Sequence, residues 1–81
     1  IKRTGYISMM RNCIIAAGNI EDKKLIDFIK RFLKSENSIL RGVSVWSLKQ
    51  LLFDTDFKKL KKDFYKIEND ENVKKEWNSI K

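Results

Sequence analysis

The sequence predicts an all-α fold, a short α-solenoid of about five antiparallel helices. Three observations lead to this prediction. Apolar residues recur at helical spacing along the whole chain, and no segment shows the alternation of a strand. The connections between helical segments are short, so consecutive helices should be antiparallel neighbours. A three-residue pattern also recurs at intervals of 30–33 residues, and 81 residues are enough for one small domain.

The first helix is expected over residues 7–17, with one apolar face turned to the core. Gly18 and Asn19 should end it, because glycine readily takes the left-handed conformation that terminates helices. Residues 1–6 would then be a linker from a missing upstream region, and residues 7–81 would form the helical repeat domain.

The second helix should span residues 23–34, with Asp22 as its N-cap. The third should begin after Asn37 or Ser38 and reach about residue 52. It is apolar around most of its circumference, so we expect it at the centre of the stack. The apolar stripe of the second helix follows the i, i+3, i+4, i+7, i+8 pattern: Leu25, Phe28, Ile29, Phe32 and Leu33.

The fourth helix is expected to begin near Thr55 or Asp56, where Asp54 and Asp56 are most simply N-cap and helix-dipole partners. The fifth should run from about Glu71 to the end of the chain. Its narrow apolar stripe is typical of a terminal helix packed on one side. The two stripes are Phe57, Leu60, Phe64 and Ile67 in the fourth helix, and Val73, Trp77 and Ile80 in the fifth.

A three-residue pattern recurs in alternate helices. It consists of an apolar residue, a basic residue and a third residue that is mostly small or polar. A period of 30–33 residues over helix pairs is the signature of an α-solenoid of the HEAT type. In such a stack Arg11 and Arg41 would align along one face or edge. They would form an arginine ladder with neighbouring acids and helix C-termini, or bind phosphate. The copies are Met10-Arg11-Asn12, Leu40-Arg41-Gly42 and Val73-Lys74-Lys75.

The chain carries 18 Lys and Arg residues against 11 Asp and Glu, a formal net charge of +7. Such a surplus attracts polyanions, either nucleic acid or anionic lipid, unless it is only an ordinary solvated surface. Lys58, Lys62 and Lys66 fall at i, i+4 and i+8, where they would contact phosphates or form a solvated face. Binding to a membrane is disfavoured, because the apolar stripe of this helix is needed for the core.

The opening segment places Lys2, Arg3 and Tyr6 before the first expected helix. Such a segment can touch a phosphate or stack on a base, and it can equally be a simple linker. Elsewhere, Trp46 and Trp77 are expected in the core.

Composition excludes several kinds of site. The chain has no His and a single Cys, which excludes Ser-His and Cys-His dyads, zinc and iron–sulfur sites, and a disulfide framework. No apolar run approaches the ~18 residues of a membrane span. By itself the chain is therefore not expected to be an enzyme or to hold a metal. Its one thiol, Cys13, is expected to be buried and inert.

Three stretches of the chain look like a family signature. They are Ile1-Lys2-Arg3-Thr4-Gly5, Met10-Arg11-Asn12 running to Ala16-Ala17-Gly18-Asn19, and Leu40-Arg41-Gly42-Val43-Ser44-Val45-Trp46-Ser47-Leu48. Together they resemble the C-terminal HEAT-like domain of epoxyqueuosine reductases. The resemblance covers nearly the whole chain, although from Phe53 onward it consists only of helical pattern. The chain departs from the family at Val43, where His is usual, at Ser47-Leu48-Lys49, where Ala-Leu-Gly is usual, and in lacking the prolines at helix starts.

The resemblance implies a function in tRNA modification. Enzymes of this family reduce epoxyqueuosine to queuosine at the wobble position, with cobalamin and two [4Fe-4S] clusters held in domains upstream of the HEAT-like part. The HEAT-like part helps to hold the anticodon stem-loop. This chain would then be a non-catalytic, monomeric, cytoplasmic tRNA-positioning tail of such an enzyme.

The residues that would contact tRNA or the upstream domains follow from matching positions and from the basic row. They are Lys2, Arg3, Arg11, Asn12, Asn19 and Arg41, together with Lys58, Lys62 and Lys66. The alternative function is a HEAT-repeat module for protein–protein interaction, which would bind its partner without regard to RNA.

Overall fold

The computed structural model describes residues 2–79, which contain five α-helices, three short 3₁₀ helices and no strand. The all-α class with five main helices is therefore confirmed. In chain order the elements are α1 (Arg3–Ile20), η1 (Lys23–Leu25), α2 (Ile26–Lys30), η2 (Arg31–Lys34), α3 (Ser38–Leu51), α4 (Asp54–Phe64), η3 (Tyr65–Ile67) and α5 (Glu71–Asn78).

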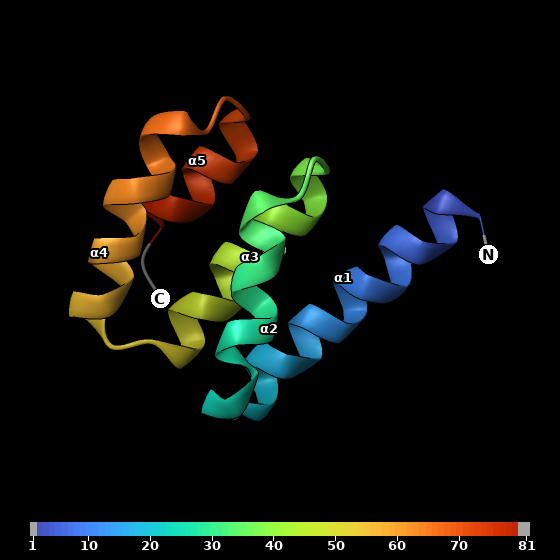
Figure 1. The fold of residues 1–81 in the computed structure, drawn as a ribbon, viewed down its shortest axis with the longest axis horizontal. Coiled ribbons are helices and arrows are strands. Elements are labelled where there is room, and N and C mark those ends of the chain that lie inside the picture. Colours follow the sequence, from blue (N-terminus) through green and yellow to red (C-terminus); the bar gives the residue numbers. More distant parts are fainter. Residues whose placement is uncertain (1, 80–81) are drawn as a thin grey trace.

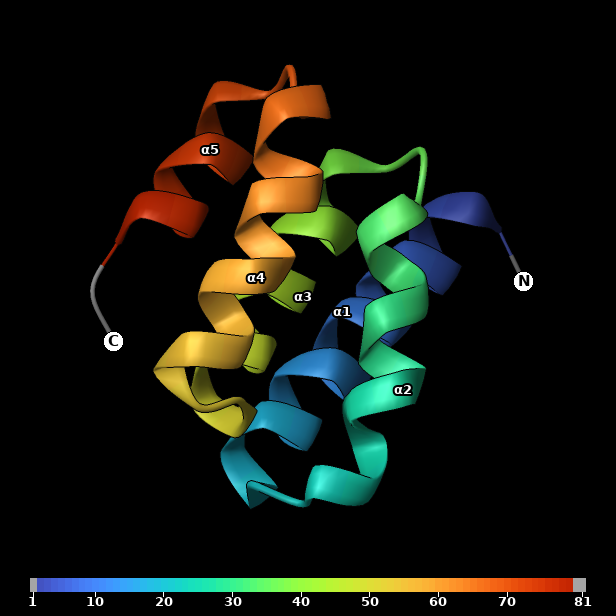
Figure 2. The same ribbon diagram turned by 60° about the vertical axis from the view of Figure 1, so that its left-hand side comes forward.

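Helix α3 lies at the centre of the molecule, as its apolar circumference predicts. Helix α1 packs on one side of it and α5 on the other, while α2 with η2 and α4 complete the body (Figures 1 and 2). Consecutive helices run in opposite directions, as their short connections predict. The finer assignment to a solenoid of HEAT-type repeats stays a prediction.

The buried core comes from α1, α2, η2, α3 and α5, and α4 packs partly buried side chains against it. Trp77 of α5 is 2% exposed and lies beside Phe57 and Phe64 of α4, with ring centroids 5.2 and 6.5 Å away. Its predicted core role is confirmed. The prediction for Ile67 is wrong, since this side chain is 71% exposed. The α-helix ends at Phe64 and continues as 3₁₀ helix with three residues per turn, so the apolar stripe loses its phase.

Helix α1 is longer at both ends than the sequence predicts. It begins at Arg3, so the expectation of a linker over residues 1–6 is wrong for residues 3–6. It also continues through Gly18 and ends before Glu21, whose left-handed backbone has a φ of 59°. The first turns are exposed and carry no apolar stripe, which is why the periodicity did not reveal them.

Gly18 serves the packing of α1 against α3 and does not end the helix. A Cβ atom at Gly18 would lie 2.9 Å from Oγ and 3.0 Å from Cα of Ser47. The Ser47 hydroxyl donates a 2.6 Å hydrogen bond to the main-chain carbonyl of Ile14 on α1. The two helices therefore approach so closely here that only glycine leaves room.

Side-chain caps begin two helices as the sequence predicts. Asp22 accepts a hydrogen bond from the main-chain N–H of Lys24 at 2.9 Å, and Asn37 caps α3 by accepting from two N–H groups. Helix α4 differs, because it begins at Asp54 without a side-chain cap. Asp54 and Asp56 lie in its first turn, where only their predicted interaction with the helix dipole applies.

Candidate nucleic-acid interface

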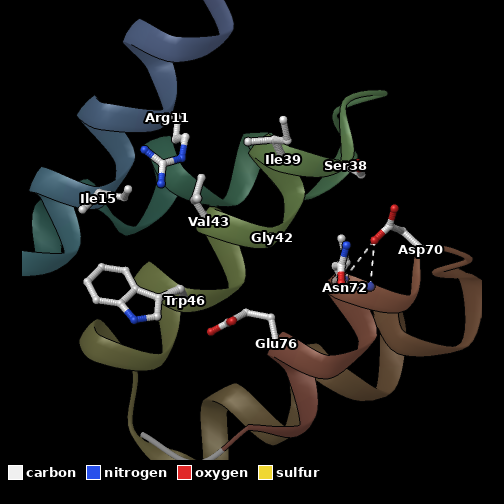
Figure 3. A pocket seen from close by; sticks show the side chains of 11 residues that line it. Arg11, Ile15, Ser38, Ile39, Gly42, Val43, Trp46, Asp70, Asn72 and Glu76 are labelled. Carbon is white, nitrogen blue, oxygen red and sulfur yellow. Dashed lines mark hydrogen bonds between the residues drawn. The ribbon is translucent and has the colours of Figure 1, made fainter.

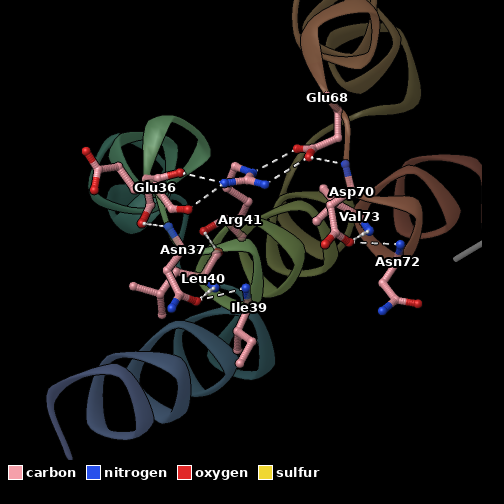
Figure 4. Close-up of polar contacts among 11 residues, drawn as sticks. Glu36, Asn37, Ile39, Leu40, Arg41, Glu68, Asp70, Asn72 and Val73 are labelled. Atoms are coloured by element: carbon pink, nitrogen blue, oxygen red, sulfur yellow. Dashed lines mark hydrogen bonds and ion pairs between the residues drawn. The ribbon is translucent and has the colours of Figure 1, made fainter. Parts of the chain in front are cut away.

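Arg41, a candidate for RNA contact, is held inside the protein by four hydrogen bonds (Figure 4). Its Nε and Nη2 donate to the two carboxylate oxygens of Glu68, at 2.9 and 3.0 Å. Its Nη1 donates to the main-chain carbonyls of Ser35 and Glu36, at 2.9 and 3.0 Å. The side chain is 17% exposed. Of the two roles that the sequence left open for Arg41, the structure therefore supports the structural one.

Lys49 makes a second charged contact between α3 and the α5 region, which the sequence analysis missed. Its ammonium group is almost buried and donates to the main-chain carbonyl and to Oε1 of Glu76, at 2.6 and 2.7 Å, and also to Oγ of Ser79. A lysine in a helix that is apolar around most of its circumference was the available signal, because a buried charge requires a partner.

Arg11 does not align with Arg41, so the predicted arginine ladder is wrong. Arg11 is exposed and lines a pocket between α1, α3 and α5 (Figure 3), whereas Arg41 points toward Glu68. Within residues 2–79 its guanidinium makes one hydrogen bond, a 3.4 Å contact to Oδ1 of Asn12, which is exposed as well. Among residues 2–79 no carboxylate lies within 4.0 Å of Arg11.

Lys58, Lys62 and Lys66 are exposed. They belong to α4 and η3, and α4 lies beside α2 and η2 (Figure 2). Asn19 is also exposed, about 24 Å along the α1 axis from Arg3. The nine candidate residues therefore do not form one surface.

The structure instead brings cations from two distant segments into one basic cleft. We define the basic cleft by Arg3 and Tyr6 of α1 and by Arg31 and Lys34 of η2. It has a volume of about 340 Å³, and among the described residues Glu36 is the one carboxylate that lines it. Within residues 2–79 none of its three cations has a carboxylate within 4.0 Å. Three unpaired positive charges thus face one negative charge.

Nothing in the sequence pattern marks Arg31 and Lys34 as site residues. Both lie at the end of the segment 23–34 and within residues 21–36, where five cations nearly balance four acids. Cations are also common at this position because they interact favourably with the negative end of a helix. Only the placement of α1 beside η2 shows that they share a cleft with Arg3.

The beginning of α1 adds positive potential to the cleft. Lys2 and Arg3 stand at the positive end of an 18-residue helix, whose first turn has no acidic residue and no side-chain cap. Lys2 is exposed, and the ring of Tyr6 is 41% exposed. An anion bound here would accept hydrogen bonds from free main-chain N–H groups as well as from the cations.

Two further expectations are wrong. Cys13 is exposed, because it lies on a face of α1 that the other helices do not cover. Trp46 is half-buried and lines the same pocket as Arg11, with one edge of its indole against Gly18. The helical spacing correctly placed Trp46 on a packed side of α3, but α1 covers that side incompletely.

Comparison with known proteins leaves the family of this chain open, since no family model matches it and no curated protein or solved structure is significantly similar to it. Within residues 2–79 no cluster of Cys, Asp and Glu is placed to hold a metal ion. In the same part of the chain no helix is long and apolar enough to span a bilayer.

Proposed function

We propose that this chain is the tRNA-positioning C-terminal domain of an epoxyqueuosine reductase and acts as a monomer in the cytoplasm. The observation that carries the proposal is the basic cleft, where three cations without acidic partners among residues 2–79 lie beside an exposed tyrosine. Such a combination suits the backbone and an unstacked base of a folded RNA. The choice of enzyme family and of tRNA as the RNA rests on the resemblance of the three signature stretches to the C-terminal domain of epoxyqueuosine reductases.

In this proposal the domain binds and orients the RNA, and domains upstream perform the reduction. Arg3, Arg31 and Lys34 neutralise phosphates of the anticodon stem-loop, and Tyr6 stacks on a base or sugar. Cobalamin and the two [4Fe-4S] clusters supply the redox chemistry when they are bound upstream. The described part of this chain offers Cys13 as its single thiol, so it does not hold a cluster.

Arg41 contributes indirectly, as a positioning residue. Its Nη1 group holds the carbonyls of Ser35 and Glu36, and both of these residues line the basic cleft. The ion pair with Glu68 fixes the guanidinium from the other side. The turn between η2 and α3 is thereby kept in place next to α1.

The test compares two variants with the same change of charge. One replaces the cleft cations (Arg3→Gln, Arg31→Gln, Lys34→Gln), and the other replaces the row on α4 and η3 (Lys58→Gln, Lys62→Gln, Lys66→Gln). Binding of an anticodon stem-loop is measured by fluorescence anisotropy at several salt concentrations. Each lost phosphate contact lowers the slope of log K against log salt by about 0.7–0.9. We expect the cleft variant to lower the slope by about 2 and the control to change it by less than 1.

The control separates a specific site from general attraction to a basic protein. If both variants lose the same affinity and the same slope, the RNA does not bind in the cleft and the site assignment is wrong. If the unchanged chain does not retain the stem-loop even at low salt, the tRNA function itself is wrong. That result would favour the rival function, a protein–protein interaction module. The apolar pocket beside Ile39, whose side chain is 52% exposed, would then be its contact surface.

A further inference from the structure

A pocket lies between α1, α3 and α5 (Figure 3), and other residues of α1 line it than line the basic cleft. It has a volume of about 440 Å³. Its apolar lining comes from Ile15 of α1 and from Ile39, Val43 and Trp46 of α3. We call it the inter-helix pocket. Its walls are apolar and aromatic, while the groups at its edge are polar. A pocket of this kind suits a flat aromatic ligand that carries polar groups around its edge.

The floor of the inter-helix pocket contains Gly42, in the middle of α3. Glycine inside a helix is less favourable than alanine by about 0.8–1.0 kcal/mol. Packing does not require it here, because an added Cβ would meet its nearest neighbour, a methyl group of Val73, at an ordinary 3.9 Å. Gly18, in contrast, is needed for the contact of two helices. The missing side chain at Gly42 leaves the pocket open without any benefit to the fold.

The rim of the pocket offers hydrogen-bonding groups of both kinds. Arg11 presents donors without a carboxylate partner in residues 2–79, and Asn72 of α5 can both donate and accept. Glu76 binds Lys49 through Oε1, and its carboxylate points across the pocket toward Trp46 (Figure 3). Nucleobases carry donors and acceptors on their edges in the same way, and proteins bind unstacked bases on aromatic rings and arginine planes.

We propose that the inter-helix pocket receives one unpaired nucleobase of the RNA whose phosphates bind in the basic cleft. This inference rests on the proposed RNA-binding function and adds a second site to it. Arg3 in the cleft and Arg11 at the pocket lie eight residues apart on α1, about 12 Å along its axis. An RNA loop that crosses α1 therefore reaches both sites. The net charge of +7 favours a polyanion over an apolar side chain of a protein partner, and Arg11 partly offsets the two carboxylates of the pocket lining, Asp70 and Glu76.

The test is a double-mutant cycle that combines variants of the pocket with RNA hairpins from which one base has been removed. Each loop nucleotide of the anticodon stem-loop is replaced in turn by an abasic nucleotide, and the dissociation constant is measured with the unchanged 81-residue chain. We expect one loop position at which loss of the base weakens binding about 5- to 100-fold, the range for stacking of one base. Trp46→Leu removes the aromatic ring of the pocket, and Gly42→Met fills the pocket. In each of these variants the same abasic hairpin should bind no worse than the intact hairpin.

Gly42→Met keeps the test independent of folding, because methionine favours helices and its Cβ has room. The salt slope should stay unchanged in both pocket variants, since they remove no cation. If the chain binds the hairpin with a steep salt slope but no single base matters, the base pocket is wrong and the proposed function survives. If the chain binds no hairpin at all, both are wrong. If the pocket variants bind every abasic hairpin with the same relative loss as the unchanged chain, the base lies elsewhere.

Discussion

Gly18 and Gly42 both lie inside helices, but only Gly18 is required by packing. In Gly18→Ala the new methyl group would lie 2.9 Å from Oγ of Ser47, an atom held in place by its hydrogen bond to Ile14. Overpacking of this kind costs about 1–3 kcal/mol, which exceeds the gain in helix propensity. We expect a net loss of about 1–2 kcal/mol in the free energy of unfolding, measured by urea denaturation. An unchanged or raised stability would show that α1 and α3 are not in close contact in solution.

Arg41 and Arg11 occupy matching positions of the predicted repeat but should respond differently to mutation. Arg41→Ala leaves Glu68, a nearly buried carboxylate, without its guanidinium, and loss of one partner of a buried pair costs about 3–5 kcal/mol. Because the Arg41 side chain is 17% exposed, we expect a loss of about 2–4 kcal/mol. Arg11→Ala serves as the control and should change stability by less than about 0.5 kcal/mol. Both variants are measured by thermal and urea unfolding. If Arg41→Ala and Arg11→Ala change the stability equally, Arg41 does not have this structural role.

At the scale of elements, helix α3 would be more stable with alanine at Gly42. The position has ordinary space for a Cβ and helical backbone on both sides. Gly42→Ala should therefore raise the free energy of unfolding by about 0.5–1 kcal/mol, the difference in helix propensity. Circular dichroism during urea unfolding measures this directly. A loss of stability would mean that the floor of the inter-helix pocket is closed in solution, which would also contradict the base-binding proposal.

The elements also show where periodicity was sufficient and where it was not. The extent of the helical segment 23–34, the N-caps Asp22 and Asn37, and the central place of α3 were predictable, because caps and apolar stripes are local features. The prediction of one helix over 23–34 is wrong, since the segment divides into η1, α2 and η2. The early start of α1 was not predictable, since its first turns are exposed and carry no apolar stripe. Ile67 was misplaced because the change from α to 3₁₀ helix is invisible to a fixed period.

At the scale of the whole molecule, the exposed cations form two groups on neighbouring elements, since η2 and α4 line a common pocket. The basic cleft lies between α1 and η2, and the lysine row lies on α4 and η3 (Figures 1 and 2). The comparison of the two charge-matched variants belongs to this scale, because it asks from which side the RNA approaches. We expect it to approach from the side of α1.

The sequence by itself determined the helical class, most helix boundaries, the apolar stripes and the positive charge, because these depend on residues close together in the chain. Only the tertiary structure decided which charges are free. Arg41 pairs with Glu68, and Lys49 pairs with Glu76, each across a sequence separation of 27 residues. Arg31 and Lys34 line the same cleft as Arg3. These pairings depend on how whole helices pack against α3, and such packing leaves no mark on the local spacing of residues.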